Sequence, residues 1–595
     1  MKIKHLFGLA VIAAMSASCS SNEDLGTAGP GTGTNEAGVG YATFSINLPT
    51  TSGTRANDQF EEGTLSEYAV NDATLLIFKK AGTSENNYTF VETVPLGNLE
   101  PWKKDNTTGN GITTEATITA KLEGATVGEG SEGKGSDYYA LVILNNKDKD
   151  NKDKVSMPVS TTSTTDTYGT WNAAAKAKNL IDYEKGFYMA NAPEFKAADQ
   201  EPTTLVQIKG IYRTKEEAQS KPGTTIHVER GLAKVTVKSS PKNYFAEGGA
   251  NVTGSNYSSD KVQITNWALD VTNKKSFPVH VTSGLMGGTT TSEGETVTGY
   301  PDIWKNEPGT APATSRFVSQ LPATGAFKRV YWGIDPNYST DYTTPGECKG
   351  AFNILGNAEI TGDVTKPQYC LENTFDIDHM KQGQTTRVIF MAKYTPKDGL
   401  AETDGTFYTI GNMTTILKKA DLETAVNNAA TSVLPGCTVN YANLETEGSH
   451  EITLADITDG TSGAVLEAET IYGTKKGKDI VKEINDKLGL KAGVGINTYF
   501  KGVTYYIARI KHFGNDLTPW AAGNETYGGK NQNWLGRYGV LRNNLYDLTI
   551  NTISGPGYPN VPEVKPTDPD DEDTKYISVS VKILDWAKHS DILDL

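Results

Sequence analysis

The sequence predicts a mainly β fold divided into more than one domain. The chain has 595 residues, which is more than a single hydrophobic core usually serves. Its 60 glycines and 25 prolines are typical of many strands joined by turns. Short apolar runs, mostly bounded by Gly, Asn or Asp, recur along the chain as they do in β-sandwiches. We therefore expect sandwich domains with few helices.

Runs of aliphatic, aromatic and β-branched residues predict the individual strands. Before residue 223 they are 73–79, 88–94, 116–122 and 138–144. A longer alternating run at 225–238 opens a second series, which continues at 262–271, 328–334, 386–394 and 541–553. Because the series restarts there, we place a domain boundary just before it. This gives an N-terminal sandwich over residues 56–222 and a C-terminal sandwich over residues 223–565.

Two helices interrupt the second series. Residues 414–430 and 478–488 each carry an apolar stripe, and in the second the residues Ile480, Ile484 and Leu488 recur every four positions. Stripes of this kind are far more often packing faces than ligand sites. We expect a few short helices within the second domain.

The first residues have the pattern of an export signal. Lys2 and Lys4 precede an apolar run, and small residues stand directly before Cys19. We expect a signal peptide over residues 1–18 and a lipid on Cys19, although Ser16 stands where a bacterial lipobox usually has an aliphatic residue. No later stretch approaches the ~20 apolar residues that span a bilayer, so membrane attachment would be through that lipid.

Two segments at opposite ends of the chain each predict a strand with one apolar face. The apolar residues are Ala42, Phe44, Ile46 and Leu48 in the first, and Ile577, Val579, Val581 and Ile583 in the second. Arg55-Ala56 follows the first strand in a small, polar stretch that a trypsin-like protease could enter. A sheet that loses a strand exposes an apolar groove and unpaired backbone groups. The C-terminal strand of another copy could fill that groove, so we expect polymerisation by donor-strand exchange.

The last strand follows a segment rich in Pro and acid. Residues 566–573 hold most of these acids, and such a composition favours an extended, solvated chain. We therefore interpret residues 566–595 as an acidic linker and a donor strand held away from its own domain. The alternative is that both terminal segments are ordinary edge strands of a monomer and that Arg55 is an exposed loop residue.

Several function classes find no support in the sequence. The net charge of −15 repels phosphate backbones and argues against nucleic acid as a partner. The seven histidines show no zinc-hydrolase spacing, and the acids of 568–573 lack the central Gly of a calcium loop. Gly128, Gly130 and Gly133 match a dinucleotide fingerprint in letters only, since no helix follows them. We expect no metal, no cofactor and no enzyme activity.

One rival function comes from the aromatic residues Trp520, Tyr527 and Trp534, which lie in a Gly- and Asn-rich stretch. They could stack on sugars, or they could cover the edge of a sandwich. The alternative function is therefore a monomeric, lipid-anchored, glycan-binding surface protein.

The cysteine count leaves one pairing open. With Cys19 lipidated, three of the four cysteines remain. Cys348 and Cys370 could form a disulfide in an oxidising compartment, which would leave Cys437 as a small buried side chain.

Further segments share an order and spacing that a single short motif would not give. They are the leader, Arg55-Ala56 and residues 186–191, 228–235, 331–336, 372–374 and 536–544. Together they resemble the Bacteroidales fimbrillins, the type V pilins, and most closely their minor-fimbrium major-subunit branch. The likeness spans nearly the whole chain.

The resemblance implies two transthyretin-like β-sandwich domains and a precursor anchored in the outer membrane by lipid. It implies maturation by an arginine-specific surface protease and assembly into a cell-surface fimbria, which supports adhesion and biofilm formation. The partners would be other copies of the chain, accessory fimbrial subunits and receptors that the sequence does not name. Carried onto this chain, Cys19 is the lipidation site, Arg55-Ala56 the maturation bond and residues 576–595 the donor segment. Shaft and tip positions both stay open.

Overall fold

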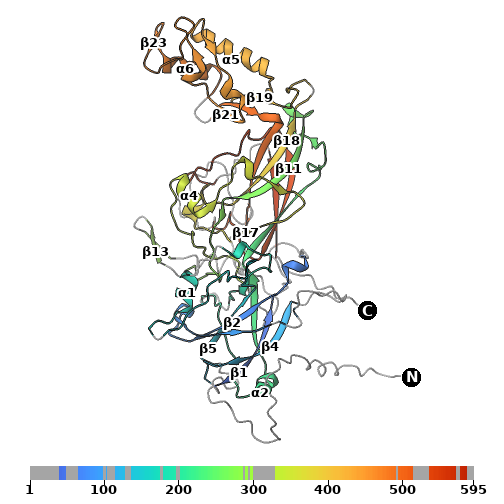
Figure 1. Ribbon diagram of the computed structural model, residues 1–595, viewed down its shortest axis with the longest axis vertical. Helices are drawn as coiled ribbons and strands as arrows, with labels where there is room; N and C mark the ends of the chain where they lie inside the picture. The colour runs from blue at the N-terminus through green and yellow to red at the C-terminus, as the bar shows by residue number, and fades with distance from the viewer. Residues whose placement is uncertain are drawn as a thin grey trace, which may run out of the picture.

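The computed structural model is mainly β, as the sequence predicts. It describes residues 39–48, 64–97, 99, 102, 114–126, 136–161, 163–174, 179–195, 201–285, 289–292, 295–298, 329–397, 399–490, 494–513, 535–570 and 577–585. The molecule is elongated, and three hydrophobic cores follow one another along its long axis (Figure 1).

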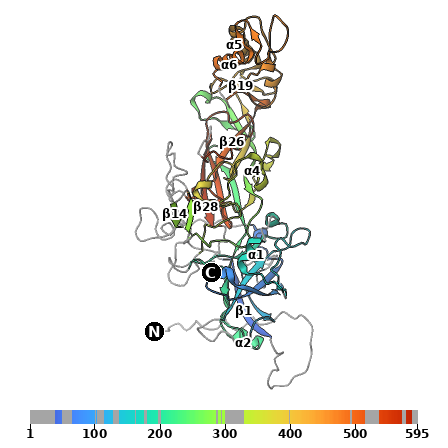
Figure 2. The same ribbon diagram turned by 90° about the vertical axis from the view of Figure 1, so that its left-hand side faces the viewer.

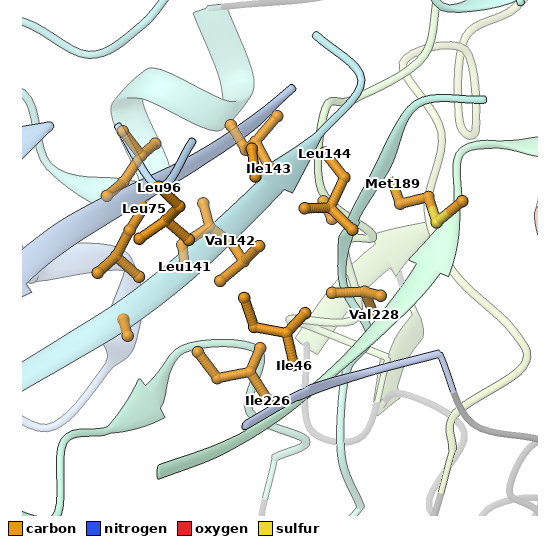
Figure 3. Close-up of a cluster of buried hydrophobic side chains, with 14 of the residues drawn as sticks. Ile46, Leu75, Leu96, Leu141, Val142, Ile143, Leu144, Met189, Ile226 and Val228 are labelled. Atoms are coloured by element: carbon orange, nitrogen blue, oxygen red, sulfur yellow. The ribbon is translucent and has the colours of Figure 1, made fainter. Parts of the chain in front are cut away.

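The N-terminal unit is a sandwich whose two layers share strand β8. Its strands follow the order β3 (Thr89–Pro95), β2 (Ala73–Lys79), β5 (Tyr138–Leu144), β6 (Met189–Asn191), β8 (Thr224–Arg230), β1 (Gly40–Asn47) and β4 (Glu115–Leu122), with β7 (Val206–Gln207) also on β5. The first half of β8 pairs with β1 and the second half pairs with β6. In the core, Ile46 of β1 and Ile226 of β8 face Val142 of β5 (Figure 3). Two short helices, α1 (Tyr168–Ala174) and α2 (Lys215–Ser220), flank this unit.

The C-terminal unit is a second sandwich. One layer has the order β17 (Gln368–Leu371), β9 (Leu232–Ser239), β27 (Asn544–Ile553) and β28 (Ile577–Asp585), and the other has β10 (Ala250–Asn251), β11 (Lys261–Asp270), β18 (Arg387–Thr395) and β26 (Val503–Arg509), with β16 (Gly362–Asp363) on β11. Buried side chains such as Trp267, Phe390 and Tyr546 fill the space between the layers. Peripheral to it lie helix α4 (Pro345–Ala351), the strand pair β12 (Thr272–Asn273) and β15 (Phe352–Asn353), and the hairpin of β13 (Thr289–Ser292) and β14 (Glu295–Thr298).

The two predicted helices form, and they belong to a subdomain inserted between strands of the second sandwich. They are α5 (Lys419–Val433) and α6 (Gly477–Lys487), and together with small strands they enclose a core of their own that includes Val426 and Ile484. The strands are β19 (Phe407–Ile410), β25 (Ile496–Tyr499) and β21 (Gly448–His450) in one sheet, and the pairs β20 (Thr438–Val439) with β22 (Ile457–Thr458) and β23 (Ile471–Tyr472) with β24 (Lys475–Lys476). This inserted subdomain lies between β18 and β26 in the sequence and forms one end of the molecule (Figure 1).

The structure places the boundary between the two sandwiches later in the chain than the sequence predicts. The run at 225–238 is two strands, β8 and β9, with Gly231 between them. Because β8 pairs with β1 and β6, it belongs to the first sandwich, and the boundary lies at Gly231 instead of before residue 223. The alternation continues on both sides of Gly231, so periodicity alone does not reveal the break.

The prediction of a strand at 328–334 is wrong, because the described residues of this stretch form no continuous strand. Arg329 and Ile334 form only isolated bridges there, to Glu194 and Val281. The aromatic and aliphatic residues of this stretch instead fill a separate cluster, in which Trp332 is fully buried.

Candidate assembly interface

Strand β1 occupies an interior position in its sheet. It runs antiparallel to β4 over its whole length and parallel to β8 from Phe44 to Asn47. We call the space between β4 and β8 that β1 fills the β1 slot. The four predicted inward residues are buried: Ala42, Phe44 and Ile46 are fully covered, and Leu48 is 1% exposed. Removing β1 would therefore open two strand edges and the N-terminal core together.

The outer face of β1 is polar and bonded to β4 and α2. Thr43 Oγ1 lies 3.0 Å from Thr119 Oγ1, and it donates a hydrogen bond to the carbonyl oxygen of Ala218. Ser45 Oγ donates to the Glu115 carboxylate over 2.8 Å. The strand is thus specified on both faces, by burial inward and by hydrogen bonds outward.

Several residues discussed in the sequence analysis lie outside the described residues. They are the predicted modification residues Cys19, Arg55 and Ala56, the aromatic residues Trp520, Tyr527 and Trp534, and the glycines Gly128, Gly130 and Gly133. After β1 the described residues stop at Leu48 and resume at Thr64. The connection that holds Arg55 is therefore the one that joins β1 to the rest of the protein.

The C-terminal strand lies at a sheet edge. β28 holds the predicted Ile577, Val579, Val581 and Ile583, and it pairs antiparallel with β27 at the end of the order β17-β9-β27-β28. Val579 and Val581 are half-buried and contact the core of the C-terminal sandwich. Figure 2 shows β28 lying along this sandwich. The expectation that the last strand is held away from its own domain is therefore wrong for this chain conformation.

The segment before β28 is also packed on the body. Asp570 is fully buried, and its carboxylate pairs with Arg509. Its backbone N–H donates to the carbonyl oxygen of Met380, and the carbonyl of Asp568 accepts from the N–H of Gln382. The solvated linker predicted from composition thus does not begin at residue 566. A carboxylate that finds a buried guanidinium is stabilised where an unpaired one would stay in water.

Partner number distinguishes the two terminal strands. β1 has a hydrogen-bonded neighbour on each side, whereas in the described part of the chain β28 pairs only with β27. The inward side chains of β1 are 0–1% exposed, but Val579 and Val581 keep part of their surface in water. The β1 slot therefore offers a strand of this pattern more burial and more backbone bonds than the edge of β27 does.

The imidazole of His227 lies beside the β1 slot, next to Asn47 in the parallel register of β1 and β8. Burial lowers its pKa to about 4, and the nearby Glu115 carboxylate opposes this shift only in part. An imidazole with a lowered folded pKa binds fewer protons in the folded than in the unfolded state. Its effect on stability is therefore absent above about pH 6.5 and becomes unfavourable as the pH falls toward 4.

We expect the free energy of unfolding to fall by up to roughly 3 kcal/mol through this residue between pH 6.5 and pH 4. Urea unfolding at pH 4 and pH 7 would measure the loss. His227→Gln should show a clearly smaller loss than the wild type. An equal pH dependence in the two proteins would contradict this role of His227.

A buried ionic cluster joins the two sandwiches, and no sequence pattern predicted it. Glu229 at the end of β8 accepts from His280 Nδ1 over 2.9 Å and from Arg329 Nε over 3.2 Å. Burial alone would raise the pKa of Glu229, but His280 and Arg329 hold it below its usual value. Next to it, Arg542 pairs with Glu372 at 3.1 Å. Alternation within β8 would have placed one of the neighbours Glu229 and Arg230 in water, yet both are buried because the second sandwich covers them.

The cysteines with described positions are free thiols. Cys348 lies on α4, and Cys370 lies on β17 in the core of the C-terminal sandwich, so the structure does not join them in a disulfide. Burial raises the pKa of Cys370 to about 12. Both thiols, like that of Cys437, are buried apolar groups.

Two further kinds of site are absent from the described ranges. No helix there has the length and apolar character needed to cross a bilayer. No group of three or more His, Cys, Asp or Glu side chains in these ranges is arranged to hold a metal ion.

Solved fimbrial proteins overlap this chain at low identity. A fimbrilin from Porphyromonas gingivalis W83 has 14% identity and a TM-score of 0.34, and the overlap covers 92% of this chain and 98% of that one. The tip fimbrial protein Mfa3 from Porphyromonas gingivalis has 10% identity and a TM-score of 0.25, with 92% and 100% covered. A fimbrial assembly protein from Parabacteroides distasonis ATCC 8503 has 12% identity and a TM-score of 0.22, with 50% and 85% covered. At these TM-scores the overlaps establish no shared function.

The sequence itself gives the more specific match. No curated protein matches the chain. Residues 497–591 match the family model of the major fimbrial subunit protein type IV, fimbrillin, C-terminal region. The matched range contains β26, β27 and β28, and therefore both the edge strand and the strand on which it lies. Over residues 497–591 the chain is thus similar to the C-terminal region of the fimbrillins.

Proposed function

We propose that this protein is a structural subunit of a cell-surface fimbria that polymerises by donor-strand exchange. It would be exported as a lipoprotein through Cys19 and matured by an arginine-specific protease after Arg55. β1 then leaves its slot, and the C-terminal strand of another copy takes its place. The supporting observation is that β1 is an interior, fully buried strand whose connection to the body runs through Arg55.

Cleavage changes β1 from part of the chain into a separate peptide. Phe44, Ile46 and Leu48 each contribute about 1.5–3 kcal/mol when fully buried, so the cut strand would stay in place until a competitor replaces it. Before cleavage the tether keeps β1 at a high local concentration, and no strand from solution competes with it. The uncut protein would therefore be a monomeric precursor.

The C-terminal strand has the apolar pattern needed to enter the β1 slot, and it gains strand partners by doing so. Its four apolar residues alternate as those of β1 do. Among the described residues it has one strand partner in its own molecule, and in the β1 slot of another copy it would have two. The gain in burial and in backbone hydrogen bonds favours the exchange and makes dissociation slow.

In a fibre built in this way, the C-terminal strand of each subunit would fill the β1 slot of its neighbour. It would support adhesion and biofilm formation and would meet accessory fimbrial subunits at its ends. The family match supports a fimbrial subunit of the cell surface. The aromatic residues that favour a monomeric glycan-binding role, Trp520, Tyr527 and Trp534, lie outside the described residues.

Treatment of the purified precursor with an arginine-specific protease tests the proposal. The wild type should form ladders that resist SDS without boiling, because an interior strand cannot leave without opening two edges. Arg55→Ala should stay monomeric under the same treatment. If the wild type is cut after Arg55 and still remains a monomer, the proposed function is wrong.

A further inference from the structure

The outer face of β4 carries a series of three polar residues that meets β1. In the antiparallel register, Thr43 lies opposite Thr119, Ser45 opposite Thr117 and Asn47 opposite Glu115. Thr43 and Ser45 form the hydrogen bonds to Thr119 and Glu115 described above. β4 therefore presents two threonines and then a carboxylate to any strand in the β1 slot.

Strand β27 presents the same chemical series to β28. Ser578 lies opposite Thr552, Ser580 opposite Thr549 and Lys582 opposite Asp547. Both acceptor strands thus offer two threonines and a carboxylate, in the same antiparallel direction. The C-terminal strand brings two serines and a lysine, where β1 has Thr, Ser and the neutral Asn47.

We propose that the C-terminal strand of a second copy enters the β1 slot with Lys582 opposite Glu115, and that this ion pair fixes the register. The inference rests on the proposed function, because it describes how the exchanged strand is seated. In this register Ser578 and Ser580 lie opposite Thr119 and Thr117. Ile577, Val579, Val581 and Ile583 take the positions of Ala42, Phe44, Ile46 and Leu48.

Registers displaced by two residues bury a charge. A shift in one direction would put Asp585 at the position of Leu48, which is 1% exposed. A shift in the other direction would put the residue two before Ile577 in the sequence, Lys575, at the fully buried position of Ala42. A displacement by a single residue would turn the apolar face outward. An unpaired charge in a core is strongly unfavourable, so the proposed register is the favoured one.

The surroundings of Glu115 suit a lysine. The Glu115 carboxylate is exposed and accepts from Ser45 in the precursor, a contact that the Ser580 hydroxyl would restore. The neighbour on the other side of the slot is His227, whose pKa of about 4 leaves it neutral near pH 7. No cation in the β1–β8 register therefore opposes Lys582 at that position. An opposite-charge pair across antiparallel strands stabilises the pairing, and a like-charge pair destabilises it.

A charge exchange in the full-length chain tests the ion pair. Glu115→Lys and Lys582→Glu should each slow the formation of SDS-resistant ladders after cleavage by about tenfold, because attraction becomes repulsion. The double variant restores an opposite-charge pair and should recover most of the wild-type rate. Lys121→Glu is the matched control, since Lys121 lies on β4 opposite Tyr41, where the proposed register places the uncharged Tyr576. Its rate should equal that of the wild type.

A cysteine pair tests the register directly. Residues opposite each other in antiparallel strands have Cα atoms about 4.5–5.5 Å apart, which is within the range of a disulfide. Thr117→Cys combined with Ser580→Cys should cross-link neighbouring subunits of the cleaved protein under mild oxidation. Thr117→Cys combined with Ser578→Cys should not cross-link them.

The outcomes separate this inference from the proposed function. Wild-type ladders with normal rates in both charge variants, or cross-links only through Ser578→Cys, would overturn the register and leave donor-strand exchange intact. Slow single variants that the double variant does not rescue would also overturn the ion pair. Failure of the wild type to form ladders would overturn the proposed function itself.

Discussion

Replacing Val579 and Val581 together by Asp should abolish ladder formation after cleavage while the precursor stays folded. In the precursor both side chains lie on an edge strand and are only half-buried, so two carboxylates there can remain in contact with water. In the β1 slot they would take the positions of Phe44 and Ile46, which are fully buried. Two unpaired carboxylates in such a core cost more than the exchange gains.

The measurement is an SDS ladder assay of the cleaved protein, with circular dichroism of the precursor to establish folding. Ser580→Asn is the matched control, because Ser580 is exposed on the outer face of the same strand and an amide brings no charge near Glu115. It should keep most of the polymerisation. Ladders of normal length from the Val579→Asp, Val581→Asp protein would mean that β28 is not the donor.

Replacing Arg542 by Ala should lower the free energy of unfolding by about 3–5 kcal/mol, because it leaves the buried carboxylate of Glu372 without its ionic partner. Arg542 also donates to Ser276 Oγ and to the carbonyl oxygen of Phe277, so its loss frees further buried acceptors. Urea unfolding of the precursor measures the change.

Two further variants make this expectation specific. Lys238→Ala breaks an ion pair with Asp547 in which the lysine is 53% exposed, and it should cost less than about 1 kcal/mol. Arg542→Lys keeps the charge but loses the planar fork, so its effect should lie between the other two. A loss from Arg542→Ala no larger than that from Lys238→Ala would show that the cluster does not hold the sandwiches together.

Local sequence patterns predicted the strands well where a continuous apolar run is buried. Residues 73–79 and 138–144 form β2 and β5 with the predicted bounds, and most residues of both runs are buried. The alternation of Ala42, Phe44, Ile46 and Leu48 likewise predicted the inward face of β1. Its place between β4 and β8 could not be predicted, since β8 lies far away in the sequence.

The misses come from contacts that no local pattern contains. Asp570 lies in an acidic, Pro-rich segment that composition assigns to solvent, but Arg509 binds it within the fold. Glu229 is buried because His280 and Arg329 arrive from other segments of the chain. In each case a distant partner reverses what the residue type alone would favour.

The inserted subdomain makes the molecule suitable as a scaffold for the display of foreign peptides. It leaves from β18 and returns to β26, which are neighbouring antiparallel strands, and it has its own core, so its outer turns can lengthen at little cost to the sandwich. Gly473 stands in the turn between β23 and β24, at the end of the molecule farthest from β1 (Figure 1). A foreign peptide grafted there would be presented once per repeat along a filament, at a spacing set by the length of the subunit.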